Sequence, residues 1–299
     1  MPRHGPTRER RRQARRGAAA VLALALFAAG CAGEMPGAAR RRAAAAIAAS
    51  GRLAPLALDT GAACRPPLAA WARNGPGETL TVYIEGDGAA YRDRLTPSDD
   101  PTPADPLALR LAGLDPGPKV ACLARPGQYL PPEALAGLDP ALWTTARYAP
   151  RALACLDAAL DAAKSALGAG RLRLVGYSGG GALAVLLAAG RTDVVALVTV
   201  AANLDTEAWT ALHRVAPLAA SRNPAEAAAP GAAIPQVPDA GSDDRNTPPW
   251  LCRRFLARMP ETTAARCLVI EGADHRHGLA EAWPGIVTGP PPDAATSRP

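Results

Sequence analysis

The sequence has few aromatic residues, which make up 4% of its 299 residues and include only two phenylalanines. A core must therefore be built mainly from aliphatic Ala, Leu and Val side chains. The sequence also lacks a membrane-spanning run. The Ala- and Leu-rich residues 17–30 are shorter than the roughly 20 apolar residues that cross a bilayer. There is no internal repeat. A chain of this length and composition is expected to fold around one core.

The formal net charge is +6, but most of the chain has no excess of positive charge. Residues 1–30 contain seven arginines and one acidic residue, Glu9, and this segment accounts for the whole excess. The rest of the chain is close to neutral and offers no basic surface to a phosphate backbone. We therefore expect no nucleic-acid partner, and we interpret the basic run Arg40–Arg42 as part of a solvated linker.

The order of residues at the start is typical of a secretory signal peptide: a basic segment, an apolar segment, and small residues before Cys31. Phe27-Ala28-Ala29-Gly30-Cys31 resembles a lipobox, in which Cys31 is lipid-modified and becomes the mature N-terminus. The alternative is a cysteine after an ordinary cleavage site. Either way we expect an exported protein of the bacterial cell envelope, periplasmic or anchored to the membrane only through lipid on Cys31.

Composition divides the chain into four expected segments. Residues 1–30 are the signal peptide, and the Ala-, Arg- and Gly-rich residues 31–50 are expected to form a flexible tether. Residues 51–288 should form the folded domain, and the proline-rich residues 289–299 a loose tail.

Paired metal-ligating cysteines are absent, since the sequence has no CxxC motif and only His275 and His277 lie at ligand-like spacing. We expect no metal site and no organic cofactor. Five cysteines follow Cys31, so an oxidising compartment should pair some of them, and at least one should be left free unless it forms an intermolecular bond. Cys252 and Cys267 are the first pair to test, because they flank the expected last crossover.

Short apolar runs alternate with longer Ala- and Leu-rich runs, which is the pattern of parallel strands joined by helices. The expected strands are Leu80–Glu85, Lys119–Ala124, Arg171–Tyr177, Val194–Val200 and Cys267–Glu271. The expected helices are Ala149–Leu167, Gly179–Ala189, Thr206–Arg214 and Trp250–Met259. Two proline-rich segments, Thr96–Pro118 and Asn223–Pro238, should form loops or lids at the carboxyl edge of the sheet, where ligands bind.

The strongest motif is Gly176-Tyr177-Ser178-Gly179-Gly180, a GxSxG pattern at the expected boundary between a strand and a helix. A serine in this place lies on a tight turn that projects its hydroxyl into the cleft, and the helix N-terminus favours negative charge beside it. Gly176 and Gly180 supply the small neighbours that such a turn needs. No lysine follows, so a phosphate-binding loop is not supported. The alternative is an ordinary glycine-rich turn.

A nucleophilic serine needs a base, and the chain after residue 30 has only His213, His275 and His277. His275 follows the last expected strand and has HxxG spacing to Gly278, so we favour it and keep His277 as the alternative. His213 falls within an expected helix and is interpreted as structural.

A carboxylate must orient the imidazole, and Asp244 lies in a turn between Ser178 and His275 in the chain order expected for this architecture. Asp243 and Asp205 remain alternatives. An oxyanion hole requires two backbone N–H groups. We assign one to Gly179 and the other to Asp87 or Gly88, which follow an expected strand; the Asp87 carboxylate should then turn away from the developing negative charge.

Together these motifs resemble those of the α/β-hydrolase superfamily, and the stretch from Tyr83 to Gly278 resembles small bacterial envelope hydrolases. The shared features outside the serine motif are Pro101-Thr102-Pro103, Leu123-Ala124-Arg125-Pro126, Asn203-Leu204-Asp205 and Pro235-Gln236. The resemblance implies the α/β-hydrolase fold, with a mostly parallel central sheet flanked by helices in a three-layer sandwich, and a triad of Ser178, Asp244 and His275.

The expected activity is hydrolysis of an ester or related acyl bond of a small acyl substrate through an acyl-enzyme intermediate. A peptidase or thioesterase of the same fold remains an alternative, because the spacing of these residues does not distinguish the leaving groups. A catalytically silent envelope lipoprotein that binds a ligand or partner is the alternative from another class.

Overall fold

The computed structural model describes residues 36–261, 263 and 265–287. The expected signal peptide, Cys31 and the expected tail at residues 289–299 lie outside the described residues. Contacts divide the chain into two compact units, residues 1–39 and 40–299. The first unit contributes only residues 36–39 to the described part, and the sheet belongs to the second.

Eight strands of the described chain form one sheet in the order β1-β2-β4-β3-β5-β6-β7-β8. Strands β3 to β8 are parallel, whereas β2 runs antiparallel to β4 and β1 runs antiparallel to β2. The strand bounds are Ala54–Pro55 (β1), Ala70–Arg73 (β2), Thr79–Ile84 (β3), Val120–Leu123 (β4), Arg171–Tyr177 (β5), Val194–Val200 (β6), Gln236–Gly241 (β7) and Leu268–Ile270 (β8).

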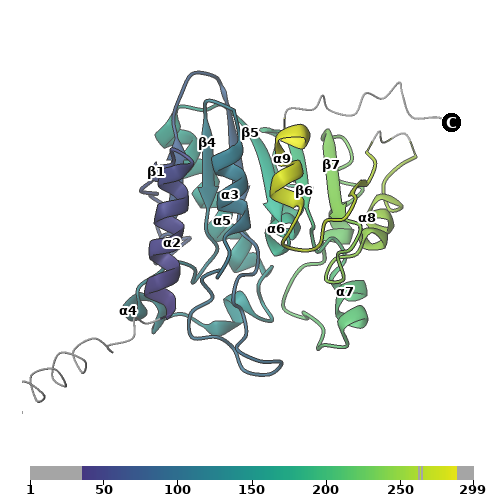
Figure 1. Ribbon diagram of the computed structural model, residues 1–299, viewed down its shortest axis with the longest axis horizontal. Coiled ribbons are helices and arrows are strands. Elements are labelled where there is room, and N and C mark those ends of the chain that lie inside the picture. Colours follow the sequence, from purple (N-terminus) through teal and green to yellow (C-terminus); the bar gives the residue numbers. More distant parts are fainter. Residues whose placement is uncertain (1–35, 262, 264, 288–299) are drawn as a thin grey trace, which may run out of the picture. The chain divides into compact units, whose positions relative to one another are not determined.

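Helices connect the strands from β3 to β8 in turn, whereas α2 precedes β1 and α9 follows β8 (Figure 1). The α-helices span Pro36–Ser50 (α2), Leu107–Leu114 (α3), Pro132–Leu135 (α4), Pro150–Leu167 (α5), Gly179–Ala188 (α6), Thr206–His213 (α7), Pro249–Leu256 (α8) and Leu279–Val287 (α9). Two short 3₁₀ helices span Pro140–Trp143 (η1) and Pro224–Ala227 (η2). Within the described residues, no helix is both long and apolar enough to cross a bilayer.

The central strands bury side chains on both faces, as parallel sheets do. In β3, Leu80, Val82 and Ile84 join one apolar cluster with residues of α5 and α6. Tyr83, which points the other way, joins a second cluster with residues of α2, α3 and α9. Helices therefore cover both faces of the sheet, and the predicted three-layer α/β fold is confirmed.

The two segments predicted to be loops contain regular structure, so the prediction is wrong there. Thr96–Pro118 includes α3, whose residues Leu107–Leu114 lie between Pro106 and Pro116 and bury an apolar face in the second cluster. Asn223–Pro238 includes the start of β7, which is held between β6 and β8 even though it contains Pro238. Packing on neighbours overrode the local effect of the prolines.

The flexible tether predicted at residues 31–50 is wrong for residues 36–50, which form α2. Ala44 and Ala48 are 0% and 1% exposed and pack in the second cluster, and the Arg41 guanidinium donates to the Leu130 carbonyl at 2.9 Å. Alanine is the best helix former, and its small side chain allows close packing. The folded unit therefore begins before residue 51, and the basic run at Arg40 is not a solvated linker.

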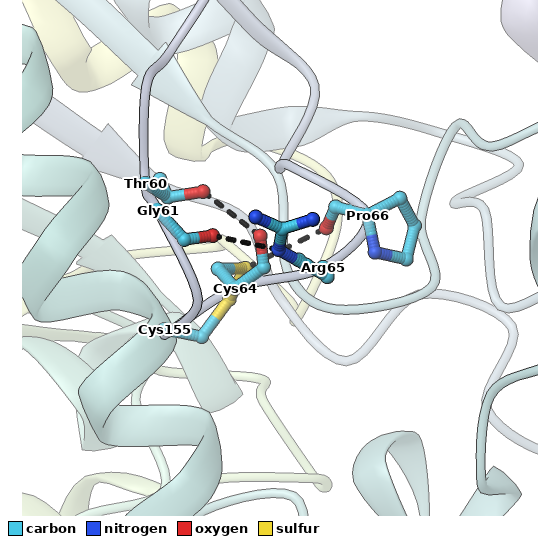
Figure 2. The surroundings of a disulfide bond; sticks show 6 residues. All are labelled: Thr60, Gly61, Cys64, Arg65, Pro66 and Cys155. Carbon is cyan, nitrogen blue, oxygen red and sulfur yellow. Dashed lines mark hydrogen bonds between the residues drawn. A yellow bond between two sulfur atoms is a disulfide. The ribbon is translucent and has the colours of Figure 1, made fainter.

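Two disulfides cross-link segments of the described chain. Cys252, on α8, bonds Cys267, just before β8, which confirms the predicted pair. Cys64 bonds Cys155 of α5, as Figure 2 shows, in a turn where Thr60 Oγ1 donates to the Cys64 carbonyl at 2.9 Å. Among the described cysteines Cys122 is free, and it is buried.

The packing of α2 can be tested with a matched pair of variants. Ala48→Asp places a charge in the apolar cluster and should lower the free energy of unfolding by about 3 kcal/mol or more. Ala46→Asp changes an exposed position of the same helix and should cost less than about 1 kcal/mol. Urea denaturation of both variants measures the difference, and equal losses would contradict a packed helix.

Candidate active site

Ser178 lies between the last residue of β5 and the first residue of α6. Its backbone has φ 52° and ψ −120°, a positive φ that is strained for a residue with a side chain. The turn is anchored on the neighbouring strand, because the Ser178 N–H donates to the Val200 carbonyl at 2.8 Å. Since β5 is central in the sheet, this anchoring fixes the hydroxyl at the carboxyl edge.

Small residues on either side of Ser178 allow this turn, as predicted. A Cβ at Gly176 would clash with the Gly180 carbonyl, and a Cβ at Gly180 would clash with the carbonyl oxygens of Ile84 and Glu85 at the end of β3. Strand and helix therefore approach each other with no room for side chains. The glycines are required by close approach and not by backbone dihedrals.

The structure brings the three predicted triad side chains together. The Ser178 Oγ lies 3.1 Å from His275 Nε2, and His275 Nδ1 lies 2.8 Å from Asp244 Oδ2. Asp244 follows β7 and His275 follows β8, so both side chains reach the nucleophile from the same edge of the sheet. These distances are within the range for a nucleophile, its base and the group that orients the base. Their catalytic role stays a prediction.

The Asp244 carboxylate is buried and held in place by its own loop. It accepts hydrogen bonds from the backbone N–H groups of Asn246 and Thr247, at 2.7 and 2.9 Å, and from Thr247 Oγ1 at 2.7 Å. Burial alone would raise the pKa of Asp244, but the hydrogen bonds and charge of His275 and the Thr247 bonds outweigh it and lower the pKa. The ionised form is therefore favoured beside the imidazole.

The imidazole of His275 is oriented by neighbours that sequence reasoning missed. Thr247 Oγ1 lies 3.2 Å from His275 Nδ1, and the Tyr177 hydroxyl donates to the His275 carbonyl at 2.8 Å. The Tyr177 and His275 ring centroids are 5.3 Å apart. Because Tyr177 precedes the nucleophile directly, its hydroxyl links the nucleophile turn to the loop that carries the base.

The alternative histidines lie elsewhere. His277 is 82% exposed and pairs with Asp274 at 2.9 Å. His213 ends α7, where its Nε2 contacts the Asn246 carbonyl at 2.8 Å and its ring packs on Trp209 at 4.8 Å. Neither ring contacts Ser178, and His213 has the structural position predicted for it.

The two alternative carboxylates, Asp243 and Asp205, contact other residues and not His275. Asp243 is exposed and contacts Ser242 at 3.5 Å. Asp205 caps the N-terminus of α7 and forms ion pairs with Arg254 and Arg258 at 2.8 and 3.2 Å. Of the three candidates, Asp244 is the one in hydrogen-bonding contact with His275.

The predicted oxyanion donors keep their N–H groups available. Among the described residues, the backbone N–H groups of Asp87, Gly88 and Gly179 donate to no acceptor. Gly179 is the first residue of α6, so the positive end of that helix begins beside the nucleophile. Asp87 and Gly88 line the same pocket as Ser178. Their function as oxyanion donors stays a prediction.

The Asp87 carboxylate lies against two buried guanidinium groups. Arg125 and Arg147, 3% and 5% exposed, both form ion pairs with it, and the Tyr148 hydroxyl lies 3.4 Å away. Burial alone would raise the pKa of Asp87, but Arg147 and Arg125 outweigh it and lower the pKa to about 2. One carboxylate thus faces two positive charges, and its negative charge is neutralised near the nucleophile. Sequence reasoning named Arg125 only as part of a shared motif and did not name Arg147; the two arginines come from separate loops.

The candidate site opens into a pocket of about 560 Å³. Ser178 and His275 line it, and its walls come mainly from the β3–α3 loop, with single residues from other segments such as Trp209 of α7. The wall residues are Glu85, Gly86, Asp87, Gly88, Ala89, Ala90, Tyr91, Pro103, Ala104, Asp105, Arg147, Tyr177, Trp209, Asn246 and Arg276. Of the segment Thr96–Pro118 that was predicted to lie at the ligand site, Pro103, Ala104 and Asp105, just before α3, line the pocket.

Glu85 is a buried carboxyl group in the pocket wall that sequence reasoning did not single out. Burial raises its pKa to about 7, against the effect of its hydrogen bonds to the Leu109 N–H at 3.2 Å and the Tyr129 hydroxyl at 3.3 Å. No group of three or more His, Cys, Asp or Glu side chains suited to a metal ion occurs within the described ranges.

Comparisons with known proteins identify the fold. No protein-family model and no curated protein matches the sequence. Among solved structures, the chain is similar to Est1E from Butyrivibrio proteoclasticus, with 15% identity, a TM-score of 0.54, and coverage of 78% of this chain and 96% of that one. It is also similar to an alpha-beta serine hydrolase homologue from Coxiella burnetii, with 15% identity, a TM-score of 0.52, and coverage of 79% and 94%.

A third similar structure is a membrane phospholipase A described as a bacterial virulence factor. Its identity to this chain is 17% and its TM-score is 0.53, with 92% of this chain and 100% of that one covered. Identities this low establish the fold alone. The chain therefore has the α/β-hydrolase fold that the sequence motifs implied.

The ion pairs of Asp87 give a prediction about stability and pH. Because the pKa of Asp87 falls from 3.8 to about 2 on folding, its ionised form stabilises the protein above about pH 4, and this contribution is lost as the pH falls toward 2. Asp87→Asn should therefore lower the free energy of unfolding at pH 7 by about 2 kcal/mol or more. Urea denaturation from pH 7 down to pH 2 should show the two proteins converging. A difference that does not depend on pH would argue against these ion pairs.

Proposed function

We propose that the protein is a serine hydrolase that cleaves an ester or related acyl bond through an acyl-enzyme intermediate. The observation that carries this proposal is the continuous chain of contacts from Ser178 Oγ to His275 Nε2, at 3.1 Å, and from His275 Nδ1 to Asp244 Oδ2, at 2.8 Å. This series of contacts begins at Ser178, on a strained turn between strand and helix, where the Ser178 hydroxyl faces a pocket.

In the proposed reaction, Ser178 Oγ attacks the acyl carbon while its proton passes to His275 Nε2. Asp244 stabilises the resulting imidazolium, and the N–H groups of Gly179 and of Asp87 or Gly88 stabilise the oxyanion. The intermediate then collapses: the bond to the leaving group breaks, and His275 gives its proton to that group. Water attacks the acyl-enzyme with His275 again as the base, which releases the acid and restores Ser178.

The aromatic lining of the pocket and one of the similar structures favour an acyl ester as the substrate. Tyr91 and Trp209 offer aromatic surface on the pocket wall, which suits the apolar part of an acyl or alcohol group. One of the similar structures is named as a phospholipase, a class of enzyme that hydrolyses acyl esters. A peptidase or thioesterase would use the same three residues, so the preference for an ester rests on these two features.

We also propose that the protein works outside the cytoplasm, in the cell envelope, held there by lipid on Cys31. The disulfides Cys64–Cys155 and Cys252–Cys267 support an oxidising compartment. The lipid anchor itself rests on the sequence around Cys31.

A serine-reactive fluorophosphonate tests the proposed nucleophile. The purified protein should become covalently labelled, because the reagent phosphonylates an activated serine hydroxyl. Ser178→Ala should abolish the labelling, which gel fluorescence or intact-protein mass spectrometry measures. Unlabelled wild-type protein that is folded by circular dichroism would instead support a silent binding protein.

The choice of Asp244 over its neighbour can be tested on the hydrolysis of a p-nitrophenyl ester. Asp244→Asn should lower kcat by a factor on the order of 10³ to 10⁴. The imidazolium of His275 loses the carboxylate that stabilises it, and the ring is no longer held in the tautomer with its proton on Nδ1. Asp243→Asn, at the exposed neighbouring position, should leave kcat within about twofold of the wild type. The reverse pattern would assign the acid to Asp243.

A further inference from the structure

Two hydrogen-bond donors converge on one nitrogen of the proposed base. The Asn246 side-chain nitrogen lies 2.9 Å from His275 Nε2, and Ser178 Oγ lies 3.1 Å from the same atom. A neutral imidazole has a single lone pair on its unprotonated nitrogen. The amide and the hydroxyl therefore cannot both make a full hydrogen bond to Nε2 at the same time.

The protonation of the ring follows from Asp244. Its carboxylate is favoured in the ionised form and lies 2.8 Å from His275 Nδ1, so Nδ1 carries the proton in the neutral ring and Nε2 is the acceptor. An amide oxygen turned toward Nε2 would place two acceptors face to face. The amide NH₂ is therefore the group that satisfies Nε2, and Asn246 acts there as a donor.

The position of Asn246 is set by contacts on both sides of its backbone. Its N–H donates to Asp244 Oδ1 at 2.7 Å, and its carbonyl accepts from His213 Nε2 at 2.8 Å. The His213 ring in turn packs on Trp209, 4.8 Å between centroids, in the pocket wall. The amide is thus held at the base by the loop that carries the triad acid and by α7.

We propose that Asn246 is a positioning residue that occupies His275 Nε2 in the resting protein and competes with Ser178 for it. This inference rests on the proposed function. While the amide donates to Nε2, the Ser178 hydroxyl lacks its base, so the amide must leave before Ser178 can transfer its proton. Asn246 lines the same pocket as Ser178, so a substrate that accepts a hydrogen bond from the amide frees the lone pair.

The rate of fluorophosphonate labelling measures this competition. Asn246→Ala should raise the second-order rate constant by roughly 3- to 10-fold, the factor that corresponds to one neutral hydrogen bond. Asn246→Asp keeps the shape but supplies an acceptor for a protonated Nε2, and should slow the labelling. A merely structural role predicts slower labelling in both variants. An unchanged or slower rate for Asn246→Ala overturns the proposal.

Arg245→Ala is the matched control, because Arg245 is the exposed residue between Asp244 and Asn246 in the same loop. Its labelling rate should equal that of the wild type. If Arg245→Ala were as fast as Asn246→Ala, loosening of the loop and not the loss of the amide would explain the gain, and the proposal would fail.

A second readout does not depend on catalysis. In a Ser178→Ala background, Asn246 is the remaining donor to His275 Nε2, so adding Asn246→Ala should shift the ¹⁵N resonance of Nε2 toward that of an imidazole nitrogen without a hydrogen bond. If the Nε2 resonance does not move, the contact between Asn246 and His275 is rejected. This result holds whether or not a fluorophosphonate labels the protein. Absent labelling together with a shifted resonance would instead reject the hydrolase assignment and keep the Asn246 contact.

Discussion

The candidate site depends on a backbone turn that residues with side chains normally avoid. Ser178 has a positive φ, and the turn is kept because β5, α6 and β3 approach one another where Gly176 and Gly180 leave no side chain between them. The packed sheet stabilises this local strain through the Ser178 N–H bond to Val200. A hydroxyl fixed in this way sets the position that the base, the acid and the oxyanion donors must reach.

Negative charge near the proposed nucleophile, Ser178, would oppose catalysis, and Asp87 belongs to the segment expected to stabilise an oxyanion. Two buried arginines solve it, because Arg125 and Arg147 pair with the carboxylate and hold its pKa near 2. The two positive charges of Arg125 and Arg147 exceed the single negative charge of Asp87. Together with the N-terminal end of α6, this positive charge would favour the negative charge that the proposed reaction develops beside Ser178.

Residues 244–247 unite several of these functions in one short loop after β7. Asp244 contacts the imidazole through Nδ1, Asn246 contacts it through Nε2, and Thr247 holds the Asp244 carboxylate. The loop is itself tied to α7 through His213. In the proposed mechanism, orientation of the base and access of Ser178 to it therefore depend on three residues of this loop, Asp244, Asn246 and Thr247.

The sequence by itself determined the α/β class, the strands β5 and β6, and the strained serine turn, because apolar periodicity and steric limits act over a few residues. It also favoured Asp244 and His275 as the triad partners of Ser178, with Asp243, Asp205 and His277 as alternatives. Tertiary structure brings Asp244, and not Asp243, into contact with His275, and it makes a packed helix of residues 36–50 where composition indicated a tether. These outcomes depend on which distant segments meet at the sheet, and neither residue spacing nor composition specifies such long-range contacts.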